Sequence, residues 1–212
     1  PSTAFLPFVA RVYLETPVAG MPNCSRVPAP TLRMSGAVPS RPYTLLARFY
    51  HRLQPQIPGM NRAARRKTLR GILPHVRSVC ELGCGTGATA LDFARRGLRV
   101  FAVDNSPTMC LLARQKARRA RLPVRVLCAD MRRFRLPEPV DLVTCEFASL
   151  NHLARRDDLG RVAQAVARAL RPGGYFLFDV NTPLSFQHQY TATYWFENPE
   201  FKLVLRGSYD AR

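Results

Sequence analysis

The sequence has few acidic residues and almost no lysine. Its 212 residues include 14 Asp and Glu against 32 Lys and Arg, a formal net charge of +18. Only Lys67, Lys116 and Lys202 are lysines, which leaves 29 arginines (32 − 3). A nucleic-acid or acidic-membrane partner would explain this charge. The preference for Arg over Lys is more typical of a GC-rich coding bias than of a binding face, which stays the alternative.

Long apolar runs and Cys-x-x-Cys pairs are also absent. No stretch approaches the ~20 apolar residues that span a bilayer, so we expect no membrane partner. With 47% hydrophobic and 22% charged residues, the composition is that of a globular protein and excludes a disordered or collagen-like chain. Without Cys-x-x-Cys pairs we expect no metal site, and we interpret the cysteines as packing residues of a cytoplasmic protein. They are Cys24, Cys80, Cys84, Cys110, Cys128 and Cys145.

Proline is concentrated in residues 1–42, where no helical or strand period persists. This density predicts an irregular N-terminal arm without a packed core. The arm is either a targeting or flexible segment or sequence upstream of the true start.

Regular patterns begin at Tyr43 and alternate between strand and helix. We expect helices over 43–53, 59–73, 86–96, 106–120 and 155–170, and strands over 78–82, 99–103, 124–129, 141–147 and 175–180. Pro172-Gly173-Gly174 is expected to stop the last helix, and Arg62, Arg65, Arg66 and Lys67 are expected on a basic helix face. The alternation predicts an α/β fold with a doubly wound, mainly parallel sheet.

A glycine-rich loop, Glu81-Leu82-Gly83-Cys84-Gly85-Thr86-Gly87, joins the first strand to a helix. Such a loop lets a ligand approach the backbone. Gly83, Gly85 and Ala88 satisfy the dinucleotide pattern, with Asp104 downstream, so an NAD(P)-dependent oxidoreductase is one alternative. The acidic Glu81, the early Gly87 and a further acid after the third strand, Asp130, argue against it.

Five motifs in order resemble the class I S-adenosylmethionine-dependent methyltransferases of the small-molecule type. They are ELGCGTG at 81–87, VDNSPTM at 103–109, CADMRRF at 128–134, FASLNHL at 147–153 and LRPGGYFLFDVNTP at 170–183. The resemblance covers residues 43–183. It implies a Rossmann-like methyltransferase sheet that binds S-adenosylmethionine.

The resemblance implies ten cofactor-binding residues: Glu81, Gly83, Gly85, Gly87, Asp104, Asn105, Met109, Asp130, Met131 and Phe147. The glycines would lie against the methionine part of the cofactor, and Glu81 would help hold its ammonium directly or through water. Asp104 would accept the ribose hydroxyls.

Around the adenine, Asn105 and Met109 would form a border. Asp130 would accept from the amino group of the base, and the Met131 amide would donate to the ring. Phe147 would face the reacting centre. Ordinary structural roles stay open for several of these residues: Gly87 as a helix-start glycine, Asp104 as a turn residue and Asp130 as a partner of Arg132 or Arg133.

Methyl transfer is an in-line displacement that requires alignment more than a catalytic triad. His152 is a candidate general base, or else a structural histidine. Tyr50 is a second candidate, from a helix that folds over the cofactor in related enzymes. The Asp that often follows this Tyr is His51 here, which puts a role for that side chain in doubt.

A small-molecule methyl acceptor is the expected partner. The basic runs at 62–67, 114–121 and 132–135 keep an RNA-directed methyltransferase as an alternative, although the Asn/Asp-Pro-Pro-aromatic signature of amino-methylating nucleic-acid enzymes is absent. A non-catalytic remnant of the fold is a third hypothesis.

The tail, residues 184–212, predicts two strands at 190–196 and 201–209 with a turn at Asn198-Pro199. We interpret it as the start of a β-rich substrate cap or as a truncated C-terminal part. The last two strands of the resembled sheet are not recognisable, so we expect a sheet that lacks them, in a chain that is either incomplete at this end or a minimal variant.

Overall fold

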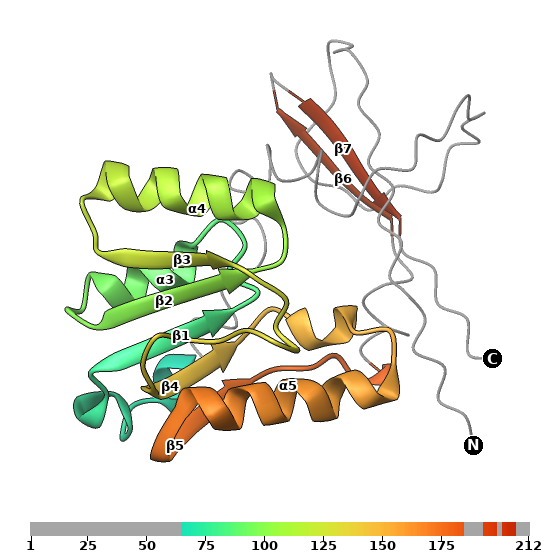
Figure 1. Ribbon diagram of the computed structural model, residues 1–212. Helices are drawn as coiled ribbons and strands as arrows, with labels where there is room; N and C mark the ends of the chain where they lie inside the picture. The colour runs from blue at the N-terminus through green and yellow to red at the C-terminus, as the bar shows by residue number, and fades with distance from the viewer. Residues whose placement is uncertain (1–64, 185–192, 199–200, 207–212) are drawn as a thin grey trace. The chain divides into compact units, whose positions relative to one another are not determined.

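The computed structural model describes residues 65–184, 193–198 and 201–206 (Figure 1). Residues 41–180 form one compact unit, and the two-stranded sheet of the tail belongs to another. The predicted arm over 1–42, the predicted helix over 43–53 and Tyr50 lie outside the described residues. The elements are η1 (Leu73–His75), β1 (Ser78–Leu82), α3 (Ala88–Ala94), β2 (Arg99–Asp104), α4 (Pro107–Ala120), β3 (Val124–Cys128), β4 (Val140–Cys145), η2 (Ser149–His152), α5 (Arg156–Ala169), β5 (Leu170–Phe178), β6 (Thr193–Asn198) and β7 (Phe201–Arg206).

The five strands β1 to β5 form one parallel sheet in the order β3-β2-β1-β4-β5, which confirms the predicted α/β fold. All five residues of β1 are buried, as expected for a central strand covered on both faces. The chain moves outward from β1 to β3 and then returns to β4 beside β1. This reversal creates a switch point between β1 and β4, where open α/β sheets bind their ligands.

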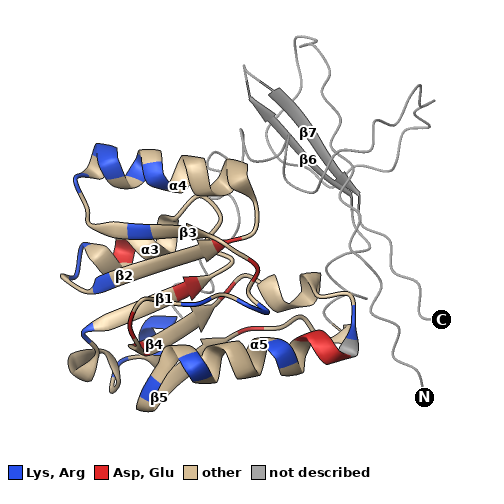
Figure 2. Cartoon of the chain, in the orientation of Figure 1, with Lys and Arg blue, Asp and Glu red and all other residues tan. Residues whose placement is uncertain are grey.

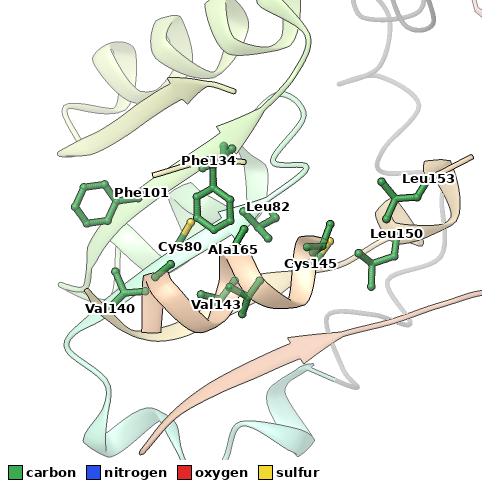
Figure 3. Close-up of a cluster of buried hydrophobic side chains, with 14 residues drawn as sticks. Cys80, Leu82, Phe101, Phe134, Val140, Val143, Cys145, Leu150, Leu153 and Ala165 are labelled. Atoms are coloured by element: carbon green, nitrogen blue, oxygen red, sulfur yellow. The ribbon is translucent and has the colours of Figure 1, made fainter. Parts of the chain in front are cut away.

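Side chains alternate between two apolar layers because successive strand residues point to opposite faces. On one face Cys80, Leu82 and Val143 pack with Ala165 of α5, and Figure 3 shows this cluster beside the helix. On the other face Val79 packs with residues of α3. Glu81 shares the strand face of Val79, so its carboxyl points into the α3 layer. The alternation of side chains along β1 therefore places the Glu81 carboxyl on the α3 side of the sheet.

Two predicted boundaries are wrong. Helix α5 ends at Ala169 and β5 begins at Leu170, so Pro172-Gly173-Gly174 lies inside the strand instead of following the helix as a stop. The pairing of β4 with β5 shifts register between Val140 and Leu142, and this irregularity accommodates the Pro-Gly-Gly segment. Strand β4 ends at Cys145, so Glu146 and Phe147 lie in the loop that follows it.

In the tail, β6 and β7 pair antiparallel from Thr193 with Arg206 to Asn198 with Phe201. The two predicted strands are therefore confirmed, with slightly different limits.

Among the described cysteines, Cys80, Cys84, Cys110 and Cys145 are buried thiols, in agreement with a packing role, but Cys128 is exposed. It follows that the packing interpretation is wrong for Cys128. None of the described helices has the length and apolar character needed to cross a membrane. Nor do the described residues contain a group of three or more His, Cys, Asp or Glu side chains arranged to hold a metal ion.

Candidate cofactor-binding site

The carboxyl ends of β1, β2, β3 and β4 meet at one edge of the sheet, and acidic residues gather there. Figure 2 shows acidic segments at and just beyond the arrowheads of these strands, whereas basic residues lie mostly on helices and peripheral loops. The parallel pairing places the end of β1 beside the ends of β2 and β4, and Asp104 of β2 beside Cys128 of β3. The predicted site residues therefore belong to loops that converge on one edge.

The glycine loop after β1 needs glycine at three positions. Gly83, Gly85 and Gly87 have φ of 67°, 52° and 82°, a left-handed region that residues with a Cβ adopt at a cost. A Cβ on Gly83 would also stand 2.5 Å from Ser149 Oγ, and one on Gly87 would stand 3.1 Å from Ala113 Cβ. The loop is thus held against its neighbours with bare backbone toward the edge of the sheet.

Asp104 ties the end of β2 to the glycine loop. Its Oδ2 accepts from the Gly85 amide at 2.8 Å, and its Oδ1 accepts from the Ser106 amide at 2.8 Å. Partial burial raises the pKa of Asp104, and these amide donors oppose the rise. The hydrogen bond from the Ser106 amide gives Asp104 the role of a turn residue, one of the alternatives left open by the sequence. Together with the Asn105 amide, the described donors leave about one of the roughly four lone-pair sites of the carboxylate for a hydroxyl donor.

Asp130, just after β3, pairs with Arg132. Arg132 Nε lies 3.0 Å from both carboxylate oxygens, and the Arg132 amide donates to Oδ1 at 2.9 Å. These hydrogen bonds lower the pKa of Asp130. The ion pair that the sequence offered as an ordinary alternative is therefore present, and Asp130 is ionised and fixed at the sheet edge.

Glu81 lies inside the protein, 4% exposed, in the layer beneath α3. Burial raises its pKa to about 8, and the neighbouring Glu146 adds to the rise while Arg65 opposes it. Within the described part of the chain, Glu81 Oε2 and Thr144 Oγ1 have no hydrogen-bond partner, and these two residues are register neighbours on β1 and β4. An enclosed acceptor without a partner fits a cation or a bridging water at this end of the sheet.

The predicted basic helix face is wrong for Arg65, which is buried. Its side chain is 9% exposed instead of solvated, and its Nη1 lies 3.1 and 3.0 Å from the two oxygens of Glu146. The same nitrogen donates to Thr89 Oγ1 at 3.2 Å, and the guanidinium stacks over Phe93. The cation therefore compensates a carboxylate in the α3 layer and does not belong to a free basic surface.

The loop after β4 contains two residues in a strained conformation. Phe147 and Ala148 have φ of 60° and 54°, although neither is glycine. Hydrogen bonds hold this turn: the Ala148 amide donates to Asp179 Oδ1 and Ser149 Oγ donates to the Glu146 carbonyl, both at 2.8 Å. Strain of this kind persists where the surrounding structure enforces it, often at functional sites.

The other predicted residues are placed as follows. Met131 is half-buried, and its Cε lies 3.9 Å from the position of a Cβ on Gly83, so it contacts the glycine loop. Asn105 is exposed after β2, and Phe147 is 37% exposed. Met109 is buried in α4.

His152 ends η2 and keeps an exposed surface. Partial removal from water lowers its pKa, and the negative charge of Asp104 opposes this. In turn His152 lowers the pKa of Asp104. This mutual effect places His152 on the Asp104 side of the edge.

Sequence reasoning missed Arg65, Glu146, Ser149 and Asp179 as parts of the site. Asp179 follows the last residue of β5, so the rule that found Asp104 and Asp130, an acid at the end of a strand, could have found it. Glu146 directly follows β4 and satisfies the same rule. Arg65 and Ser149 depend on contacts between segments distant in the sequence, and no local pattern indicates them.

Comparison with known proteins gives one family match. A family model described as a methyltransferase domain matches residues 79–174. A dTDP-4-amino-2,3,4,6-tetradeoxy-D-glucose N,N-dimethyltransferase of Saccharopolyspora spinosa is 35% identical over 111 residues, which cover 52% of this chain and 43% of that protein. The chain spans less than half the length of the first curated relatives that it matches.

Two solved structures share the fold over most of the chain. The sugar N-methyltransferase KedS8 from Streptoalloteichus sp. has a TM-score of 0.65 and 25% identity, with 88% of this chain and 74% of that chain covered. CalS10, an amino pentose methyltransferase from Micromonospora echinaspora solved with S-adenosylmethionine bound, has a TM-score of 0.59 and 26% identity, with 81% and 70% covered.

Proposed function

Because residues 79–174 form a class I S-adenosylmethionine-dependent methyltransferase domain, we propose that the chain transfers a methyl group from S-adenosylmethionine to a small-molecule acceptor by in-line displacement. One observation carries the proposal: three glycines with positive φ converge with Asp104 and Asp130 at the ends of adjacent parallel strands. The oxidoreductase alternative finds no support in the comparisons.

The residues at this edge fit such a cofactor. The bare backbone of Gly83 and Gly85 would accommodate its amino-acid part. Glu81, whose Oε2 has no hydrogen-bond partner among the described residues, would help hold its ammonium directly or through a water. The remaining lone pair of Asp104 would accept a ribose hydroxyl. Asp130 would accept from the base, Asn105 and Met109 would border it, and the Met131 amide would donate to its ring.

When bound, the cofactor supplies an electrophilic methyl group on a sulfonium. The protein's part is to orient the acceptor in line with that group and to exclude water. Phe147, held in its strained turn, would cover the reacting centre. His152, with a lowered pKa, is neutral at pH 7 and able to accept a proton from the acceptor.

For the acceptor we propose the amino group of a sugar. The two solved relatives and the curated dimethyltransferase described above act on amino sugars or at sugar nitrogen, as their names state. A neutral amine is itself a nucleophile, and it needs a base only to remove its proton. We also propose a cytoplasmic location, because the described cysteines are free thiols.

Isothermal titration calorimetry with S-adenosylmethionine and S-adenosylhomocysteine tests cofactor binding. Asp104→Ala removes a charged acceptor and should weaken binding by about tenfold to a hundredfold. Asp157→Ala, which removes one exposed carboxylate from α5, should leave binding unchanged. The proposal is wrong if the wild type binds neither compound or if Asp104→Ala binds as well as the wild type does.

The acceptor class needs a separate experiment. Mass spectrometry would follow methyl transfer to nucleotide-linked amino sugars, phenols and carboxylic acids offered in parallel. We expect one or two methyl groups on the amino sugar and none on the others. Transfer to a phenol or a carboxylic acid alone would retain the enzyme class and overturn the amino sugar.

A further inference from the structure

The sheet has a basic hollow at the end opposite the candidate cofactor-binding site. This hollow measures about 460 Å³ and lies where β1 and β2 begin, beside η1 and the end of α3. Figure 2 shows basic segments at the starts of β1 and β2, whereas acidic segments lie at their arrowheads. At about 3.3 Å per residue, strands of five and six residues put roughly 15–20 Å between the two ends. The hollow is therefore separate from the edge where methyl transfer is proposed.

Four exposed arginines line the hollow, and within the described part of the chain their guanidinium groups form no ion pair. They are Arg66, Arg70, Arg77 and Arg96. Asp141 accepts from the Arg77 backbone amide, but its ion pair is with Arg171. A coding bias accounts for the choice of Arg over Lys, but not for four such cations around one hollow.

Apolar side chains complete the lining of the hollow. Leu73, Pro74 and Leu98 are partly or largely exposed there, and Val76 is buried beside them. A guanidinium binds a phosphate through two parallel hydrogen bonds and also stacks on a nucleobase, and apolar side chains pack against the faces of bases. The hollow therefore combines partners for both parts of a nucleotide, the phosphate and the base.

A second hollow, of about 170 Å³, continues the first, because Arg66 and Arg96 line both. It also contains Asp92, whose carboxylate lies 3.1 Å from Arg95 Nη1 and 3.5 Å from Arg65 Nη2, so cations already compensate its charge. The two hollows form one elongated basic groove, and a chain of phosphates fits such a groove better than a single anion does. The net charge of +18 attracts a polyanion from a distance.

We propose that this basic groove binds a single-stranded nucleic acid, with phosphates on the four arginines and a base against the apolar lining. In a duplex the bases are stacked on one another, so only a single strand offers the face of a base. An acidic peptide offers carboxylates but no base to stack on a guanidinium. The nucleic acid is a bound partner and not the methyl acceptor, because the groove lies at the far end of the sheet from the candidate cofactor-binding site.

Fluorescence anisotropy tests this with the full chain, without cofactor, and with labelled oligonucleotides of about twelve uridines or thymidines. Arg70→Gln combined with Arg77→Gln should weaken binding of the preferred oligonucleotide about tenfold at ~0.1 M salt. Each phosphate contact of a single strand contributes about 0.7 to the slope of log K against log salt concentration, so the slope should become shallower by about 1.4. The oligonucleotide that binds more tightly shows whether the ligand is RNA or DNA.

Arg133→Gln combined with Arg155→Gln is the matched control. Both arginines are exposed, and they follow β3 and precede α5 at the carboxyl edge of the sheet. The control removes the same charge beyond the screening length of about 10 Å from the groove, so it should retain the affinity and the slope of the wild type. Thermal melting identifies any variant that fails to fold, and Arg66→Gln combined with Arg96→Gln is a second groove variant for that case.

A loss of affinity confined to the groove variants supports the proposal. It is overturned if the wild type binds neither oligonucleotide, or if the control loses as much affinity as the groove variants, which would show attraction by net charge alone. A loss confined to the control places the nucleic acid at the carboxyl edge and overturns it as well. So does a polyglutamate peptide of equal length that displaces the label as efficiently as unlabelled oligonucleotide does. Because no cofactor is present, these outcomes are independent of the proposed function.

Discussion

Gly83 and Ser149 lie so close that any side chain at position 83 would collide: a Cβ there would stand 2.5 Å from Ser149 Oγ and 2.9 Å from Ser149 Cβ. Gly83 belongs to the loop after β1, and Ser149 begins η2 after β4. The contact therefore closes the switch point between the two central strands, where the cofactor is proposed to bind.

Gly83→Ala should lower the free energy of unfolding by about 2–4 kcal/mol, because it combines the cost of a left-handed residue with a collision. Gly97→Ala is the control for the first cost, since Gly97 has φ of 80° and nothing within 4 Å of its Cβ position. It should lose only about 1 kcal/mol. Urea denaturation compares the two, and equal losses would show that the collision is relieved without cost.

Glu81 should make the protein less stable as the pH rises. Its pKa is raised from 4.5 to about 8 in the folded state, so between these values the folded state binds the additional proton. The free energy of unfolding then falls as the pH rises, by about 2 kcal/mol between about pH 6.5 and 8.5. Chemical denaturation across this range measures the slope.

Glu81→Gln has no proton to lose and should flatten that slope. Glu138→Gln, which removes a carboxylate paired with Arg99 at the surface, should retain the slope of the wild type. If the Glu81→Gln protein and the wild type share one slope, Glu81 does not titrate in this range.

His152 should act as the base if the acceptor loses its proton before or during transfer. Its lowered pKa makes it neutral above about pH 6.5, so kcat should rise with pH through a value below that. His152→Gln should reduce kcat by about 10²–10⁴ and remove this dependence. The control is His75→Gln, which replaces an exposed histidine of η1. If His152→Gln keeps the pH profile of the wild type, His152 has a structural role only.

The local patterns were sufficient to predict the sheet. Apolar strand segments, Ser106 as the cap of α4 and the acids at strand ends all depend on neighbours in the sequence, and Ser106 does accept from the Met109 amide. Contacts across the fold escaped prediction. Arg65 reaches Glu146 across 81 positions, and the turn that contains Phe147 is held by a hydrogen bond from the Ala148 amide to Asp179, 31 positions away.

The most sensitive of these long-range contacts is the pair Arg65 and Glu146. Arg65→Met would leave a buried carboxylate without its cation, which costs about 3–5 kcal/mol. Arg66→Gln, at the exposed neighbouring position, should change the stability by no more than about 0.5 kcal/mol. Adding Glu146→Gln to Arg65→Met removes the uncompensated charge and should restore part of the loss. Urea denaturation of the four proteins tests this, and a double variant no more stable than Arg65→Met would show that the guanidinium acts through Phe93 and Thr89 rather than through Glu146.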